Sequence, residues 1–213
     1  MKTDDLISVL AAGAAPVPRR AASRTIAVAT AAGIAIAALM MLLTVGARPD
    51  LGQAILWPMF WMKVLFPVVV AGASFVTLTR LARPGVHARA GGIAIVLPVL
   101  LLWLLAIAAY ASAPLPERSA MVWGQTWRIC TLNIALISAP IFAAAFFALR
   151  QLAPTQLAQA GACAGALSGA AGAAVYAFHC PETALPFMAV WYVAGVAVPV
   201  SVGAWLGPRF LKW

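Results

Sequence analysis

The chain has 213 residues, of which 64% are hydrophobic and 9% are charged, and its mean hydropathy is +0.99. An ordinary soluble domain carries roughly 25% charged residues, so this composition excludes a soluble fold and indicates an integral membrane protein. The formal charge of +9 does not indicate direct nucleic-acid binding, because the lysines and arginines stand singly between apolar runs instead of clustering on one face.

The N-terminal tail, residues 1–24, contains a short amphipathic pattern. Two acidic residues come first and suit the positive end of a helix, and three apolar residues then recur at helical spacing. In chain order these residues are Asp4, Asp5, Leu6, Ile7 and Leu10. The pattern predicts one or two turns of helix, which are too short to be stable alone in water. We therefore expect this helix to be ordered when a partner binds it.

Six apolar segments follow the tail, each close to the roughly 20 residues that cross a bilayer. Lipid offers the backbone no hydrogen-bond partners, so segments this apolar must be helical. They lie at about residues 25–45, 61–79, 92–111, 129–149, 158–178 and 187–206. The predicted fold is therefore all-α, a polytopic membrane protein with a tail at 1–24 and six transmembrane helices within 25–213.

The basic residues predict the orientation of these six helices. Ten lysines and arginines fall in the two tails and in the loops after the second and fourth segments, against three in the alternate loops. By the positive-inside rule both termini are cytoplasmic. Aromatic residues near the opposite ends of the spans favour the same orientation as an interfacial belt, and they are Trp57, Trp61, Tyr110, Trp123, Trp127, Tyr176, Trp191 and Tyr192. Lys63, one turn into its span, is interpreted as an anchor that reaches the same surface, or else as a functional charge.

Several small and polar residues inside the spans have structural interpretations. Glycines at 161, 165, 169 and 172 predict close helix packing, inside the bundle or at a dimer face. Asn133 and Ser138 are expected to form interhelical hydrogen bonds, and Cys163 to be a buried free thiol. No Asp or Glu lies in a predicted span, which weighs against a coupled transporter. A small transporter or channel with Lys63, Asn133 and the glycines along its path is the alternative function.

The polar run His179-Cys180-Pro181-Glu182 stands between two apolar segments, and the predicted topology places Cys130 on the same side of the membrane. Three readings of these residues stay open. Cys180 is packed and the run merely starts a loop; the two cysteines form a disulfide; or Cys130, Cys180 and His179, with Glu182, bind a soft or borderline metal ion. The sequence shows neither a close thiol pair nor a cofactor site, so we expect no enzyme and no bound cofactor.

Several stretches resemble the NrsF family of bacterial membrane anti-sigma factors. They are the opening Met1-Lys-Thr-Asp-Asp-Leu6-Ile7, the six-span layout, Trp127-Arg-Ile-Cys130, and Phe178-His-Cys-Pro-Glu182 followed by Pro186-Phe187 and Trp191-Tyr192. The resemblance implies a cytoplasmic segment that holds an extracytoplasmic-function sigma factor at the inner membrane. It also implies a paired-cysteine sensor of heavy-metal or oxidative stress, formed here by Cys130 and Cys180. Asp4, Asp5, Leu6, Ile7 and Leu10 would then bind the sigma factor.

Overall fold

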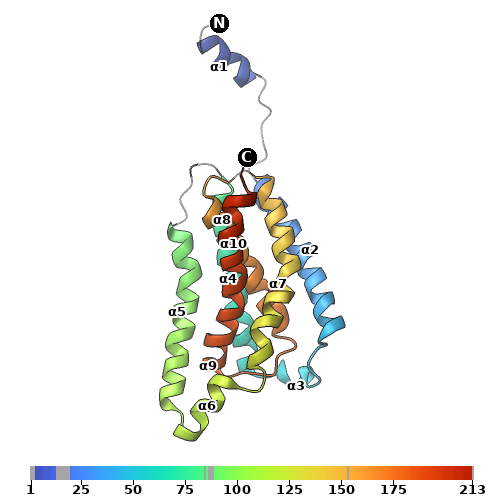
Figure 1. Cartoon of the computed structure of the whole chain (residues 1–213), viewed down its shortest axis with the longest axis vertical. Coiled ribbons are helices and arrows are strands. Elements are labelled where there is room, and N and C mark those ends of the chain that lie inside the picture. The colour runs from blue at the N-terminus through green and yellow to red at the C-terminus, as the bar shows by residue number, and fades with distance from the viewer. Residues whose placement is uncertain (1–2, 13–19, 84, 86–88, 153, 213) are drawn as a thin grey trace.

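The computed structural model of the chain describes residues 3–12, 20–83, 85, 89–152 and 154–212, without the side chains of Val9, Leu10 and Arg89. Every regular element in these residues is a helix (Figure 1), as the apolar pattern predicted. In order they are α1 (Thr3–Ala12), α2 (Ala21–Thr44), α3 (Leu51–Ala54), α4 (Pro58–Leu81), α5 (Arg89–Ser112), α6 (Leu115–Trp123), α7 (Trp127–Arg150), α8 (Leu157–Tyr176), α9 (Leu185–Phe187), the π-helical turn η1 (Met188–Tyr192) and α10 (Val193–Phe210).

Five stretches among the described residues are long and apolar enough to cross a membrane. They are Ala21–Thr44, Pro58–Leu81, Ala90–Ser112, Leu115–Arg150 and Leu185–Phe210. Each coincides with one of the predicted spans to within a few residues at its ends or contains it. The remaining predicted span forms α8, which is not among the five. Alanine and glycine make up most of α8, and most of its residues are buried by neighbouring helices. Because its side chains contact protein instead of lipid, α8 does not need the high hydropathy of a lipid-facing helix.

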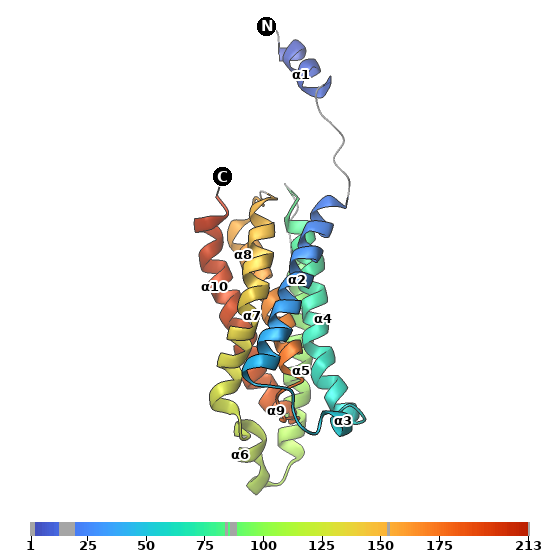
Figure 2. The same ribbon diagram turned by 90° about the vertical axis from the view of Figure 1, so that its right-hand side faces the viewer.

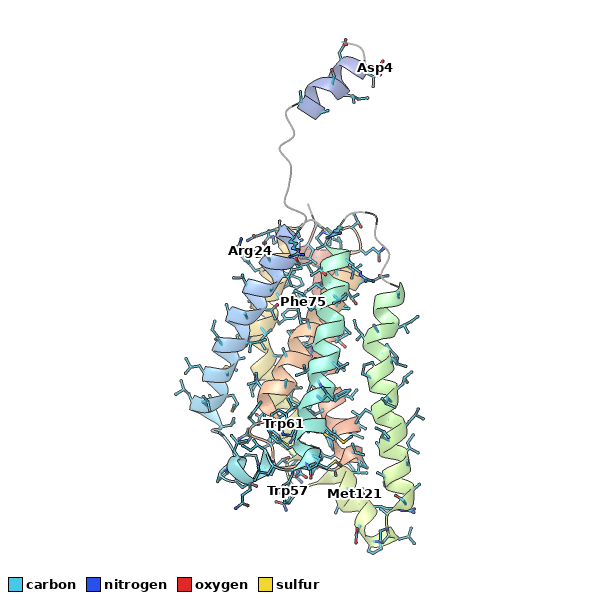
Figure 3. The ribbon with its side chains drawn as sticks, turned by 180° about the vertical axis from the view of Figure 1, so that it is seen from behind. Asp4, Arg24, Trp57, Trp61, Phe75 and Met121 are labelled. Carbon is cyan, nitrogen blue, oxygen red and sulfur yellow. The ribbon has the colours of Figure 1, made fainter. Side chains whose placement is uncertain are left out.

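The long helices form one bundle around α8. The contacts of α8 are most extensive with α10, and it also packs against α4 and α7, while α2 lies on α7 and α5 on α4. The last described residues lie at the same end of the bundle as the start of α2, and α1 stands apart beyond that end (Figures 1 and 2). Asp4 and Arg24 lie toward this end, and Trp57 and Trp61 lie toward the other (Figure 3). Each end has its own cluster of buried apolar side chains.

The glycine stripe of α8 packs inside the bundle, as predicted, and does not form a dimer face. Gly161, Gly165 and Gly169 face the backbone or proline side chain of α10, and Gly172 faces Ser138 of α7. These contacts let the backbones of α8 and α10 approach closely. Ser138 itself bonds within its own helix, to the carbonyl of Ala135 at 2.7 Å, so its predicted interhelical bond is wrong.

Replacement of Gly165 by alanine is expected to destabilise the bundle. A Cβ atom there would lie 2.6 Å from Cα of Val200, a backbone contact that cannot be relieved by a rotamer change. Overpacking of this kind costs about 1–3 kcal/mol, so Gly165→Ala should lower the melting temperature of the detergent-solubilised protein. Gly72→Ala is the matched control, because a Cβ on that α4 glycine meets nothing within 4 Å. Equal melting temperatures for the two variants would contradict the packing of α8 on α10.

Candidate functional site

Two cysteines far apart in the sequence meet near one end of the bundle. Cys130 lies in the first turn of α7, and Cys180 follows the C-terminal end of α8. Both are completely buried in one apolar cluster, and neither is in a disulfide. Cys130 lies close enough to Cys180 to be the largest influence on the pKa of that thiol. The packing of α7 against α8 therefore brings the two predicted sensor thiols close together.

Glu182 fixes the loop after α8 against the start of α7. Its Oε1 accepts hydrogen bonds from the backbone N–H groups of Gln125, at 2.6 Å, and Thr126, at 3.3 Å. Thr126 is the N-cap of α7, where unpaired amides and a partial positive charge favour a carboxylate. Gly124 has a φ of +51°, and a Cβ there would lie 2.7 Å from the Glu182 carboxylate, so glycine fits best. Glu182 thus holds Cys180, two residues earlier, beside Cys130.

Lys63 enters the site from α4. Its Nζ donates hydrogen bonds to the carbonyl oxygens of Cys180, at 2.6 Å, and Glu182, at 2.7 Å, and lies 5.3 Å from the ring centroid of Tyr192. Lys63 is completely buried, so its interpretation as a surface anchor is wrong. The loop carbonyls supply acceptors inside the protein, and the side chain does not need to reach water. A lone charge within a span was the sequence signal for this residue, because such charges mark functional sites.

The surroundings of Cys180 lower the pKa of its thiol below the ordinary value. The largest cause is the hydrogen bond from Cys130. Burial acts in the opposite sense and raises the pKa. The positive charge of Lys63 and the backbone N–H of Glu182 lower it further. Thiolates, not thiols, attack oxidants and bind metal ions. Of the two thiols, Cys180 is therefore the one whose surroundings favour the thiolate.

His179 is not grouped with the two thiols. Its Nδ1 bonds to the carbonyl oxygen of Gly46 at 2.8 Å, and its ring lies 5.4 Å from that of Tyr176. Within the described part of the chain, no three His, Cys, Asp or Glu side chains are grouped so that they could hold a metal ion. The structure thus brings Cys130 and Cys180 together and leaves His179 bonded to the segment after α2.

Two tyrosines that the sequence assigned to the aromatic belt lie in the core. Tyr176 and Tyr192 are completely buried with their rings 6.2 Å apart, whereas Trp57 and Trp61 are exposed as a belt requires. Asn133 of α7 donates a hydrogen bond to the Tyr176 hydroxyl at 3.4 Å, which is the predicted interhelical bond. Position near a span end does not tell which way a side chain points. Tyr192 ends the π-helical turn η1, a local distortion frequent at functional sites.

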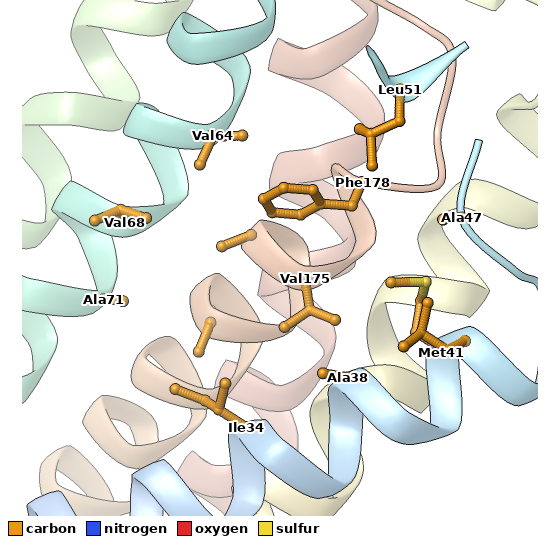
Figure 4. A pocket seen from close by; sticks show the side chains of 13 residues that line it. Ile34, Ala38, Met41, Ala47, Leu51, Val64, Val68, Ala71, Val175 and Phe178 are labelled. Carbon is orange, nitrogen blue, oxygen red and sulfur yellow. The ribbon is translucent and has the colours of Figure 1, made fainter. Parts of the chain in front are cut away.

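An apolar groove of about 500 Å³ lies behind this loop, between α2, α4 and α8 (Figure 4). Met41 of α2, Val64 and Val68 of α4, and Val175 of α8 line it, together with Phe178. Phe178 immediately precedes His179, and its carbonyl oxygen accepts the backbone N–H of Arg48 at 3.1 Å. The groove therefore reaches the loop that carries Cys180.

The third cysteine lies in the cluster at the opposite end of the bundle. Cys163 of α8 is buried, and its Sγ donates a hydrogen bond to the carbonyl of Ser74 at 3.2 Å. The prediction of a buried free thiol is confirmed. Because Cys163 shares no contact cluster with Cys130 or Cys180, it is a natural control for experiments on that pair.

The predicted partner-binding residues lie on α1, a helix of ten residues and so slightly longer than predicted. Asp4 and Asp5 occupy its first turn. The side chains of Leu6 and Ile7 are 42% and 58% exposed. The side chain of Leu10 lies outside those that the structure describes. An amphipathic helix with exposed apolar side chains stands at the end of the bundle opposite the thiol pair (Figure 1).

Comparison with known proteins agrees with the resemblance seen in the sequence. The family model described as "NrsF: Negative regulator of sigma F" matches residues 10–213. The chain is 44% identical to the probable anti-sigma-F factor NrsF of Azospira oryzae and 37% identical to the anti-sigma-F factor NrsF of Caulobacter vibrioides, in both cases over the full length of both proteins. No solved structure matches it. The chain therefore belongs to the NrsF family.

Proposed function

We propose that this chain is an anti-sigma factor of the bacterial inner membrane. It holds an extracytoplasmic-function sigma factor through its N-terminal segment and releases it under oxidative or heavy-metal stress. The observation that carries the proposal is the full-length match to two proteins named as anti-sigma-F factors. Such a protein acts by binding and signalling and catalyses no reaction.

The N-terminal segment, residues 1–24, is the proposed partner-binding part of the chain. Sigma factors are helical, and a short amphipathic helix suits a groove between helices. Leu6, Ile7 and Leu10 supply the apolar anchors, and Leu6 and Ile7 are exposed for that purpose. Asp4 and Asp5 meet basic residues that the sigma factor otherwise presents to DNA. Ordering of the segment on binding costs affinity but makes the complex easy to switch.

Residues 25–213 form the proposed transmembrane sensor, with six crossings and both termini in the cytoplasm. The fifth crossing in chain order is α8, whose 20 residues span roughly 30 Å as a helix, the thickness of the hydrocarbon core. Basic residues at the α1 end of the bundle support this orientation by the positive-inside rule. They are Arg20, Arg24, Arg80, Arg83, Arg150, Arg209 and Lys212. The thiol pair then lies near the periplasmic surface.

The proposed signal is a reaction at Cys130 and Cys180. An oxidant removes two electrons and two protons from the two thiols, which become joined by one S–S bond. A thiol-binding metal ion instead binds both sulfurs and releases their protons. His179 is the proposed third ligand, available once its bond to Gly46 is broken. Either reaction replaces the thiol hydrogen bond by a stronger link of different geometry.

Only a small part of the free energy of the reaction at the thiol pair needs to reach the sigma-binding segment. A tenfold loss of affinity for the sigma factor corresponds to about 1.4 kcal/mol of coupling free energy. A disulfide typically changes stability by about 2–4 kcal/mol. The reaction at the thiol pair therefore provides enough free energy, provided that the helices transmit it.

Substitution of an apolar anchor of α1 is expected to weaken capture of the sigma factor strongly. The full chain in detergent is mixed with each purified extracytoplasmic-function sigma factor of the source genome, and the one retained is used afterwards. Leu6→Asp and Leu10→Asp should reduce its capture at least about tenfold, because a carboxylate cannot enter an apolar groove without losing its hydration.

The matched control is Ser8→Asp. Ser8 lies on the opposite side of α1, two residues from Leu6, and the substitution adds the same charge. Its capture of the sigma factor should equal that of the wild type. Undiminished capture by the Leu6 and Leu10 variants would remove the assignment of the anchors, and retention of no sigma factor by the wild type would remove the proposed function.

A further inference from the structure

The side chain of Lys63 lies in the interior of the bundle without a carboxylate ion-pair partner among the described residues. It is completely buried, and the one ion pair formed within the described residues joins Arg48 to Asp50. The carboxylate of Glu182, whose carbonyl oxygen Lys63 contacts, is bonded to the amides of Gln125 and Thr126 instead. An ammonium group away from water is expensive even when hydrogen-bonded. Packing alone would be satisfied by methionine, so a polar amine that bonds two loop carbonyls needs an explanation beyond packing.

Two charged side chains, Glu182 of the loop itself and Lys63 of α4, hold the loop that carries Cys180. The Glu182 carboxylate binds it to the start of α7, where Cys130 lies. The Lys63 ammonium binds its carbonyls, those of Cys180 and Glu182, to α4. Glu182 therefore sets the position of one sulfur relative to the other, and Lys63 connects the pair to a helix that carries neither.

From Lys63, α4 leads to the other end of the bundle. Leu78 and Leu81, in its last turn, belong to the buried cluster at that end. Ile26, in the first turns of α2, belongs to the same cluster, and α2 follows the N-terminal segment in the chain. A contiguous chain of contacts thus joins the Cys180 loop to the start of α2 through α4, and coupling between distant sites can be carried by such packed elements.

We propose that Lys63 is a positioning residue that couples the thiol pair to α4. The inference rests on the proposed function. When the Cys130 and Cys180 sulfurs become joined, the loop moves and its two carbonyls no longer meet the ammonium as before. A buried cation tolerates little loss of acceptors, so α4 moves with the loop and changes its contact with the first turns of α2.

The test is the full chain with Lys63→Met, which keeps the length of the side chain and removes its charge and donors. The protein in lipid nanodiscs is loaded with the captured sigma factor and treated with a thiol-oxidising reagent. Two quantities are measured in the same sample: the fraction of Cys130–Cys180 disulfide, by thiol trapping, and the fraction of sigma factor released. Lys63→Met should still capture the sigma factor and form the disulfide. At the same fraction of disulfide, however, the fraction of sigma factor that it releases should be about tenfold lower than in the wild type, or lower still.

Lys63→Arg and Lys212→Met complete the design. Arginine keeps a positive donor at the site and should restore release at least in part, which a purely structural defect would not allow. Lys212 is exposed near the C-terminus, and its substitution should change nothing. If Lys63→Met fails to fold, Lys63→Gln takes its place with the same expected result. Release by Lys63→Met or Lys63→Gln at the wild-type level, at an equal fraction of disulfide, would overturn the inference. A wild-type protein that forms the disulfide without release would instead overturn the proposed function.

Discussion

Cys130→Ser and Cys180→Ser are expected to capture the sigma factor normally and to release none of it when an oxidant is added. The two cysteines lie in one buried cluster, and Cys130 is the largest influence on the pKa of Cys180. Removal of either leaves no intramolecular disulfide to form. Serine is nearly the same size as cysteine, so the packing around α7 and α8 should be kept. Release is measured as sigma factor in the unbound fraction after treatment of the loaded nanodiscs.

Cys163→Ser is the control for these two variants. Cys163 is a buried thiol in the other cluster, bonded to the carbonyl of Ser74, and serine can form the same bond. This variant should release the sigma factor like the wild type. A protein with both Cys130 and Cys180 replaced that still releases its partner would remove the thiol pair as the sensor. A Cys163 variant without release would move the sensor to the opposite end of the bundle.

The reaction of Cys180 with a small alkylating reagent is expected to proceed at a pH where ordinary thiols are inactive. Its pKa is lowered, first of all by the Cys130 hydrogen bond and then by the charge of Lys63. A depressed pKa means that the thiolate is present above that value and is lost as the pH falls through it. An ordinary thiol, with a pKa of about 8.5, gains about 100-fold in thiolate between pH 6 and 8. Cys180 should gain much less over that range.

The measurement uses the Cys163→Ser protein and mass spectrometry of the peptide that contains Cys180. Burial slows the absolute rate, but the ratio of rates at two pH values still reports the thiolate fraction. In Cys130→Ala the main hydrogen bond is absent, and the gain between pH 6 and 8 should increase toward that of an ordinary thiol. A steep, unchanged profile in both proteins would show that Cys130 does not activate Cys180.

Much of the architecture could be predicted from hydrophobicity alone. Apolar runs long enough to cross a bilayer must be helical, so the long helices fall where the sequence places them, to within a few residues. The four-residue spacing of glycines in α8 likewise predicts close packing, because glycines on one face let helix backbones approach closely. The short helices α3 and α6 were missed. They lie in the connections between spans, where hydropathy carries little information.

The polar contacts of the site could be predicted only in outline. Topology places Cys130 and Cys180 at one end, but which side chains point at them depends on the rotation of each helix. That rotation buries Lys63 and Tyr192 instead of leaving them at the membrane surface. It also depends on the path of one loop, in which Glu182 turns toward the amides before α7 and His179 toward Gly46. Distances of this kind follow from tertiary packing and not from spacing along the chain.

The link between the thiol pair at one end of the bundle and the partner at the other is tested most directly by one titration of the wild-type protein. Nanodiscs loaded with the captured sigma factor are oxidised stepwise, and disulfide and released sigma factor are measured at each step. Release should rise in proportion to the Cys130–Cys180 disulfide and reverse when a dithiol reductant is added. Complete disulfide formation with the sigma factor still bound would contradict transmission through the bundle.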